Sequence, residues 1–192
     1  IYPVLREMEE MGRVRRGHFA LGTTSAQLAI PGAVVRLRAL RTVAGDEPAV
    51  LLAATDPAQP YGGLLDWPDS RSGAGRPRRA VGAAVVIVEG RLALFIDRGG
   101  ARVLSFIDET SDSGASQIER ALRRLSTGVS RLGLRRLRIE EIDGAKARSS
   151  RLAAAFVAAG FRAGYRGLEI DRFADSSQPR THERIESEAE DQ

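Results

Sequence analysis

The sequence contains no cysteine, a single lysine and few aromatic side chains. Its 192 residues include one Trp, three Tyr and six Phe. The absence of Cys excludes disulfide bonds and thiolate metal ligands. No apolar run approaches the roughly 18 residues that a membrane-spanning helix needs. The composition therefore predicts no membrane partner, and the lack of Cys fits a cytoplasmic location.

Charge is distributed unevenly along the chain. Residues 172–192 hold three Arg and six acidic residues, which leaves 26 basic and 19 acidic residues, a net charge of +7, in the preceding 171. Such a basic body suits a polyanionic partner. A GC-rich genome would also enrich Arg over Lys without any functional reason. The charge therefore favours nucleic-acid binding but does not establish it.

The first part of the chain, residues 1–41, has the pattern of the second half of a winged-helix unit. Apolar residues recur at helical spacing over residues 2–11. Residues 13–21 alternate loosely and are centred on Gly17, which predicts a short hairpin. A second short helix is predicted over residues 32–40. We expect the other half of this unit to precede the present chain in a longer protein.

Basic and polar side chains gather on this unit. A hairpin that follows a helix can lie along a phosphate backbone, where Arg side chains and polar groups fix the position of the nucleic acid. The predicted nucleic-acid contacts are Arg13, Arg15, Arg16, His18, Gln27, Arg36, Arg38 and Arg41. In the alternative interpretation these are solvated surface residues, and Gln27 caps the loop before the second helix. Arg36 and Arg38 cannot share one narrow helix face, because they are two positions apart.

Residues 42–171 predict an α+β domain. Three strands at 81–88, 91–96 and 102–107, separated by tight Gly turns, predict an antiparallel meander. Further elements are a strand at 50–54, a helix at 116–125 that extends toward 132, a strand at 134–142, an Ala-rich helix at 149–159 and a strand at 168–171. The predicted fold class is α+β: a partial winged helix, then a mainly antiparallel, barrel-like β-rich domain with two or three helices. The acidic tail at 172–192 is expected to be disordered.

Two loops have both a functional and a structural interpretation. Trp67, near Tyr61, could stack on an unpaired base, but we favour its use as an anchor that holds the loop against the sheet. Residues 69–79 contain a second basic run, formed by Arg71, Arg76, Arg78 and Arg79. Such a loop can bind nucleic acid without sequence preference, or it can serve only for solubility.

No catalytic motif occurs in the sequence. There is no G-x-x-x-x-G-K-[ST] phosphate loop, and the one lysine, Lys146, has no glycine-rich cradle around it. The two histidines, His18 and His182, lie far apart, which argues against a His-based metal site. We therefore expect no catalytic residue, cofactor site or metal site in this chain.

Two long stretches resemble the C-terminal region of the large helicase-related (Lhr) family of DEAD/DEAH-box superfamily 2 ATP-dependent DNA helicases. They are residues 3–17, which read Pro-Val-Leu-Arg-Glu-Met-Glu-Glu-Met-Gly-Arg-Val-Arg-Arg-Gly, and residues 27–38, which read Gln-Leu-Ala-Ile-Pro-Gly-Ala-Val-Val-Arg-Leu-Arg. The resemblance implies a parent enzyme of DNA repair that binds ATP and Mg²⁺ upstream of this chain and translocates on single-stranded DNA. This chain would then contact single-stranded or tailed duplex DNA, or an RNA–DNA hybrid.

Three alternatives stand beside this interpretation. A base-excision DNA glycosylase would need a carboxylate, for which Glu169 and Asp171 are the nearest to the end of the last strand. An oligomerisation domain, giving a homo-oligomer, could use the edges of the meander. A stand-alone transcriptional regulator is disfavoured, because the first half of its winged helix would be missing.

Overall fold

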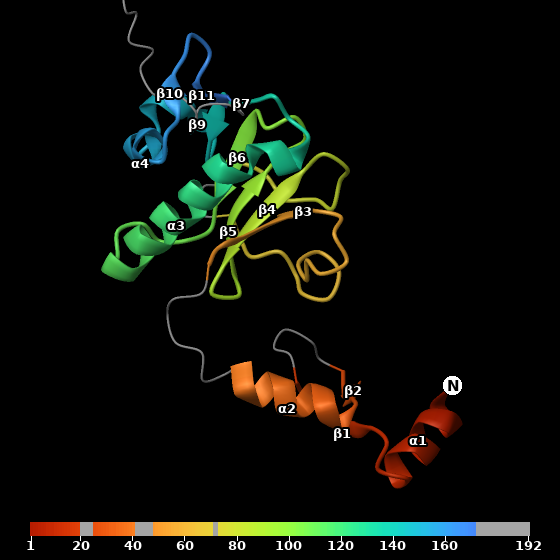
Figure 1. The fold of residues 1–192 in the computed structure, drawn as a ribbon. Coiled ribbons are helices and arrows are strands. Elements are labelled where there is room, and N and C mark those ends of the chain that lie inside the picture. The colour runs from red at the N-terminus through yellow and green to blue at the C-terminus, as the bar shows by residue number, and fades with distance from the viewer. Residues whose placement is uncertain (20–24, 41–47, 71–72, 172–192) are drawn as a thin grey trace, which may run out of the picture.

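A computed structural model describes residues 1–19, 25–40, 48–70 and 73–171 (Figure 1). Within them, four α-helices and three sheets of mostly antiparallel strands confirm the α+β class. The described segments form a small N-terminal unit, residues 1–40, and a larger unit, residues 48–171. Arg41 and the predicted disordered tail at 172–192 lie outside the described residues.

The N-terminal unit contains two helices and one pair of strands. Helix α1 (Tyr2–Glu10) is followed by strand β1 (Arg15–Gly17), strand β2 (Gln27–Ala29) and helix α2 (Pro31–Leu40). The two strands are antiparallel, with Arg15 opposite Ala29 and Gly17 opposite Gln27. The predicted helices are therefore confirmed.

The predicted hairpin within residues 13–21 is wrong, because its second strand comes later in the chain. Gly17 lies in β1, opposite Gln27, and not at a turn. The Phe19 backbone N–H donates to Gln27 Oε1 at 2.8 Å, which extends the contact between the two segments beyond β1. A Cβ on Gly17 would lie 3.0 Å from the Phe19 ring, so the glycine also makes room for that ring.

Little of the N-terminal unit is buried in the described residues. Val14 and Val34 are its buried apolar side chains, and α1 has no buried residue. Large apolar side chains that stay exposed are Ile1, Tyr2, Val4, Met11, Leu28, Ile30, Val35 and Leu37. In α2, Val34 is thus buried, whereas Leu37, three positions later, is exposed.

The larger unit is built on a six-stranded open sheet. Its strands are β3 (Val50–Ala53), β4 (Ala84–Val88), β5 (Arg91–Ile96), β6 (Arg102–Ser105), β8 (Glu141–Ile142) and β9 (Ala145–Lys146), in that spatial order. Strands β4 to β6 confirm the predicted meander. All neighbours are antiparallel except β6 and β8. The predicted barrel-like closure is wrong, because β3 and β9 remain separate edges within the described residues.

A second sheet of three strands explains why no barrel forms. It is antiparallel and consists of β10 (Arg162–Ala163), β11 (Leu168–Asp171) and β7 (Arg136–Ile139). The single strand predicted at 134–142 is divided at Glu140, whose N–H donates to the Ala101 carbonyl at 2.7 Å. This division assigns β7 to the small sheet and β8 to the large one.

Helix α3 (Asp112–Gly128) begins earlier than predicted. Ser111 Oγ accepts the Gly114 N–H at 3.1 Å, which is the N-cap contact that satisfies a free donor of the first turn. The helix continues into the 3-10 turn η1 (Val129–Leu132), as predicted for the segment toward 132.

Helix α4 (Ala153–Ala158) is shorter than the Ala-rich helix predicted at 149–159. A 3-10 turn, η2 (Ala147–Ser149), precedes it. Ser150 has extended backbone, and its Oγ accepts the Leu152 N–H at 3.3 Å. This local bond competes with helix formation and delays the helix start.

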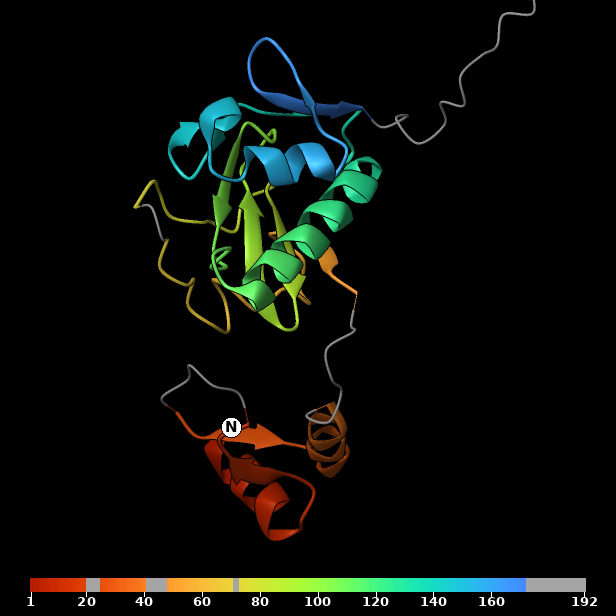
Figure 2. The ribbon, with the colours of Figure 1, turned by 90° about the vertical axis from the view of Figure 1, so that its left-hand side faces the viewer.

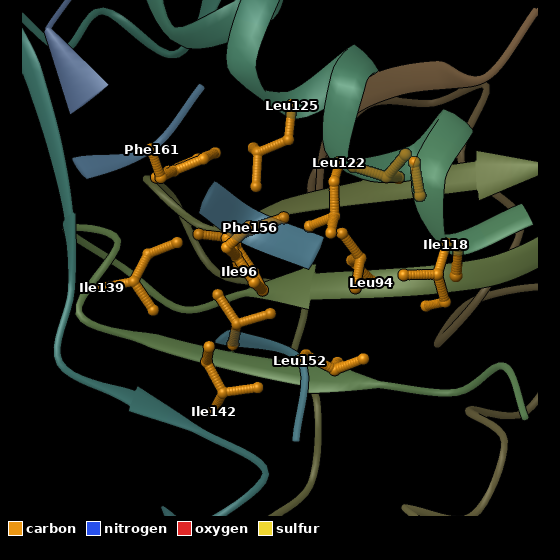
Figure 3. Close-up of a cluster of buried hydrophobic side chains, with 14 of the residues drawn as sticks. Leu94, Ile96, Ile118, Leu122, Leu125, Ile139, Ile142, Leu152, Phe156 and Phe161 are labelled. Atoms are coloured by element: carbon orange, nitrogen blue, oxygen red, sulfur yellow. The ribbon is translucent and has the colours of Figure 1, made fainter. Parts of the chain in front are cut away.

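The central strands are buried on both faces, which explains the continuous apolar run over residues 84–88. Helix α3 packs against β3, β4 and β5 and lies across one face of the sheet (Figure 2). The larger core cluster lies between this face of the sheet and helices α3 and α4, and its side chains come from all three (Figure 3). Its largest fully buried members are Phe156, Phe161, Leu94, Ile96, Ile118, Leu122 and Leu125.

The described parts of the loop between β3 and β4, residues 54–70 and 73–80, cover the other face of the sheet. The Trp67 ring stacks on Tyr61 at a centroid distance of 6.2 Å and meets the edge of Phe95 at 5.8 Å. The Tyr61 hydroxyl donates to the Gly90 carbonyl at 3.0 Å and accepts the Leu92 N–H at 3.1 Å. The prediction that Trp67 anchors the loop is confirmed, and its ring contacts leave little room for a stacked base.

Candidate nucleic-acid interface

The predicted contacts of the hairpin fall into two groups. Arg13, Arg15 and His18 are exposed, around the end of α1 and along β1. Neighbouring side chains of a strand point to opposite faces, so Arg15 and Arg16 point in opposite directions. Arg16 is also exposed, but its guanidinium forms an ion pair with Glu9 of α1. Arg15 is therefore available to an anion on a face that Arg16 does not share.

Gln27 contributes to the architecture of the hairpin. It lies in β2, half-buried, and its side-chain oxygen accepts the Phe19 N–H. This contact is a loop cap, the alternative interpretation considered from the sequence. A role for Gln27 in DNA contact stays a prediction.

The arginines of α2 are exposed but diverge. Arg36 and Arg38 lie two positions apart, which is about 200° around a helix. They therefore extend the basic surface in different directions. Residues 1–40 contain six Arg and three Glu, and one of those Arg, Arg6, pairs with Glu10 at 3.2 Å. The unit is basic overall, and Arg41 lies outside its described part.

The arginines of the second basic run, within residues 69–79, differ in their surroundings. The Arg79 guanidinium is half-buried and donates to the backbone carbonyls of Gln59 at 2.8 Å and Asp56 at 3.0 Å. These hydrogen bonds join the end of the covering loop, at Arg79, to its beginning, at Asp56 and Gln59. Arg76 and Arg78 are exposed and line a pocket on the sheet, whereas Arg71 lies outside the described residues.

The sequence did not predict that Asp97 and Glu141 line that pocket. Asp97 follows β5 and reads as a turn former, and Glu141 reads as a surface residue of a strand. The parallel pairing of β6 with β8 places Glu141 opposite Arg102. No local pattern predicts that pairing, because the two strands are far apart in the sequence: Ser105 at the end of β6 bonds to Asp143, 38 positions later.

The two carboxylates considered for glycosidic cleavage are held by arginines. Asp171 Oδ1 lies 2.7 Å from Arg136 Nε, and Glu169 Oε2 lies 3.5 Å from Arg138 Nε. The hydrogen bond that Arg136 donates to Asp171, with the negative charges of Asp171 and Glu169, raises the pKa of the Arg136 guanidinium. These ion pairs form across β7 and β11, where Asp171 is opposite Arg136 and Glu169 opposite Arg138.

Within the described residues, no helix is both long enough and apolar enough to cross a membrane. In the same ranges, no three His, Asp or Glu side chains lie close enough together to hold a metal ion.

Comparison with known proteins gives one family match and two relatives. Residues 1–49 match the winged-helix domain of the large helicase-related protein. The Mycolicibacterium smegmatis "Lhr helicase/probable uracil glycosylase" is 48% identical over 110 residues, covering 55% of this chain and 7% of that protein. The Escherichia coli "Lhr helicase/uracil glycosylase" is 33% identical over 167 residues, covering 85% of this chain and 10% of that protein.

The chain thus spans a tenth or less of the length of either relative. The winged-helix match covers the unit that carries the exposed arginines, and the E. coli match extends the similarity through most of the α+β unit. Together these matches identify the chain as a region of an Lhr helicase-related protein.

Proposed function

We propose that this region holds single-stranded or tailed duplex DNA as an accessory part of an ATP-dependent helicase. The observation that carries the proposal is the exposure of Arg15 on β1, and of Arg13 and His18 on either side of that strand, in a winged-helix unit. Guanidinium groups on such a projection can each neutralise a phosphate. In this proposal ATP and Mg²⁺ bind elsewhere in the parent protein, which works in DNA repair in the cytoplasm.

Binding through the N-terminal unit is electrostatic and has little sequence preference. The first 171 residues carry a net charge of +7, and the aromatic Trp67 is engaged in its own loop. Backbone contacts by arginine supply affinity without reading bases. The apparent affinity for a single strand should therefore fall steeply with salt.

The test uses the full chain, a fluorescently labelled oligonucleotide and anisotropy over a salt series. The variant Arg13→Ala/Arg15→Ala should bind more weakly, and the slope of log affinity against log salt should decrease by about 1.4, or ~0.7 per lost phosphate contact. The matched control is Arg131→Ala/Arg135→Ala, which removes the same charge from exposed positions of the larger unit. Equal effects of both double variants, or a salt-independent affinity, would refute the proposed contact.

A second candidate function is excision of uracil from DNA. It is favoured by the names of both relatives, which include uracil glycosylase. The chain offers Glu169 and Asp171, which pair with Arg138 and Arg136 across β7 and β11. A carboxylate can stabilise positive charge that develops on a sugar.

Uracil release from a uracil-containing oligonucleotide tests this candidate. Asp171→Asn and Glu169→Gln are compared with Asp112→Asn, an exposed acid at the start of α3. Loss of uracil release in Asp171→Asn or Glu169→Gln, with release retained in Asp112→Asn, would support this candidate. Absence of release by the unmodified chain would assign that activity to other parts of the parent protein.

A further inference from the structure

A pocket of about 400 Å³ lies on the sheet face that is opposite α3, beneath the segment 74–80. Its apolar side is formed by Phe95 of β5 and Leu104 of β6, with Ala80 from the covering segment. This volume is within the usual range of small-molecule sites. Phe95 is 5% and Leu104 7% exposed, so the apolar floor offers a small contact area to a flat ring.

One wall of the pocket is formed by the charged side chains of Asp97, Arg102 and Glu141. Arg102 Nε lies 3.1 Å from Asp97 Oδ2, and the Arg98 backbone N–H donates to Asp97 Oδ1 at 2.7 Å. Glu141 stands opposite Arg102 in the parallel pairing of β6 and β8. Asp97 uses two of the five N–H donors of Arg102, so the remaining donors and the Glu141 carboxylate can meet a ligand.

The segment over the pocket is cationic. Arg76 and Arg78 are exposed and line the pocket, and the charge of Arg78 helps to lower the pKa of Asp97 on the pocket wall. The segment that carries them is held in place, because Pro77 is buried and Arg79 is bonded to the loop carbonyls. The two guanidinium groups are thus presented at the pocket by a fixed support.

We propose that this pocket binds one unpaired nucleotide of a DNA strand, with the base on Phe95 and Leu104 and the phosphate at Arg76 and Arg78. The inference rests on the proposed function, since it supplies a second contact for the same single strand. A site for bare phosphate would have no use for Glu141, whose charge repels an anion. The edge of a base offers donors and acceptors together, which suits Arg102 beside Glu141.

Guanine fits this wall better than thymine. Guanine presents acceptors at O6 and N7, which arginine prefers to bind, and its N1–H and N2–H₂ donors match a carboxylate. Thymine offers a single N–H donor. We therefore expect dGMP to bind more tightly than dTMP, and Glu141→Gln to reduce this difference.

Trp67 provides an intrinsic reporter. It is the one Trp of the chain, and its ring touches Phe95, which lines the pocket. Titration of the full chain with dGMP should change Trp fluorescence in a saturable way. Arg76→Ala/Arg78→Ala should weaken dGMP binding by about tenfold or more, as expected for loss of charge-assisted hydrogen bonds.

Two controls make the outcome specific. Arg131→Ala/Arg135→Ala removes equal charge away from the pocket and should leave dGMP binding unchanged, as should Arg13→Ala/Arg15→Ala. Thermal melting of each variant shows that it is folded. Arg13→Ala/Arg15→Ala should impair only oligonucleotide binding, whereas Arg76→Ala/Arg78→Ala should impair dGMP binding. The failure of one proposal can therefore be distinguished from the failure of the other.

Three results would overturn the pocket proposal. One is no saturable signal with dGMP, even while the oligonucleotide still binds. Another is equal affinity for inorganic phosphate and dGMP, which would reduce the pocket to an anion site. The third is the same loss of affinity in the pocket variant and in the matched control.

Discussion

Arg16 of β1 and Glu9 of α1 form an ion pair, in which Nη2 lies 2.9 Å from Oε2. The pair connects the strand to the helix that precedes it. It also balances the charge of one of the two adjacent arginines, so that Arg15 is the stronger phosphate ligand of the two. The predicted cluster of Arg13, Arg15, Arg16 and His18 is thus divided by a contact within the unit itself.

Release of Arg16 should strengthen DNA binding. Glu9→Gln removes the negative partner, so the guanidinium of Arg16 becomes available and the unit gains one net positive charge. We expect affinity for a single strand to rise at low salt and the salt slope to increase by up to about 0.7. Anisotropy titrations measure both. Glu7→Gln, which makes the same charge change, is the control; an equal gain in both variants would show that only net charge matters.

Gly62 is the position of the covering loop where a side chain is least tolerated. Its φ is 71°, and a Cβ would lie 2.3 Å from Trp67 Nε1. Gly99 has φ 80° with no atom within 4 Å of its Cβ position. Gly62→Ala should cost about 2–4 kcal/mol of unfolding free energy, and Gly99→Ala about 1–2 kcal/mol, because only the former adds overpacking to backbone strain. Chemical denaturation measures both values, and equal losses would contradict the Trp67 contact.

Elements with strong local signals were predictable from the sequence. The strand at 91–96 and the strand at 168–171 have the predicted bounds. The first lies between two glycine turns, and the second ends a short hairpin. The same reasoning places helix α1 within one residue of its observed end, because Gly12 follows it with positive φ. Apolar periodicity and turn residues are sufficient in these segments.

Elements set by distant partners were not predictable. β1 pairs with β2, which begins ten positions after Gly17, and nothing in residues 13–21 specifies that partner. The division of 134–142 into two strands depends on a bond from Glu140 to Ala101, which belongs to another part of the chain. The pocket wall needs the parallel pairing of Arg102 with Glu141. Such contacts follow from packing of the whole unit.

The Phe156–Phe161 contact should be a main determinant of stability in the larger unit. Both rings are fully buried, and they meet edge to face at a centroid distance of 5.1 Å. Phe156→Ala leaves a cavity between α4 and the sheets and should cost about 3–5 kcal/mol. The neighbouring Val157 is 51% exposed, so Val157→Ala should change stability by less than about 0.5 kcal/mol. Similar losses of stability in both variants would contradict the observed orientation of α4, in which Phe156 is buried and Val157 is exposed.

The Asp97–Arg102 pair should make stability depend on pH in the acid range. Burial raises the pKa of the Asp97 carboxyl, but hydrogen bonds from Arg102 and the Arg98 backbone outweigh that effect, so the pKa is lowered. A lowered pKa in the folded state means that the contribution is complete above the ordinary value of about 3.9 and is lost as pH falls through the folded pKa. Because Asp97 is 32% and Arg102 59% exposed in their side chains, solvent screening limits the contribution to about 0.5–1 kcal/mol.

The comparison is between the unmodified chain and Asp97→Asn, which keeps the shape of the side chain but cannot ionise. Unfolding free energies from denaturant titrations should differ most near neutral pH and converge as the pH is lowered well below 4. Asp112→Asn, at an exposed position outside the pocket, controls for general loss of a carboxylate. A difference that stays constant with pH would mean that Asp97 acts through its hydrogen-bonding shape alone. In that event Arg102 would hold its place in the pocket wall without the charge of its partner.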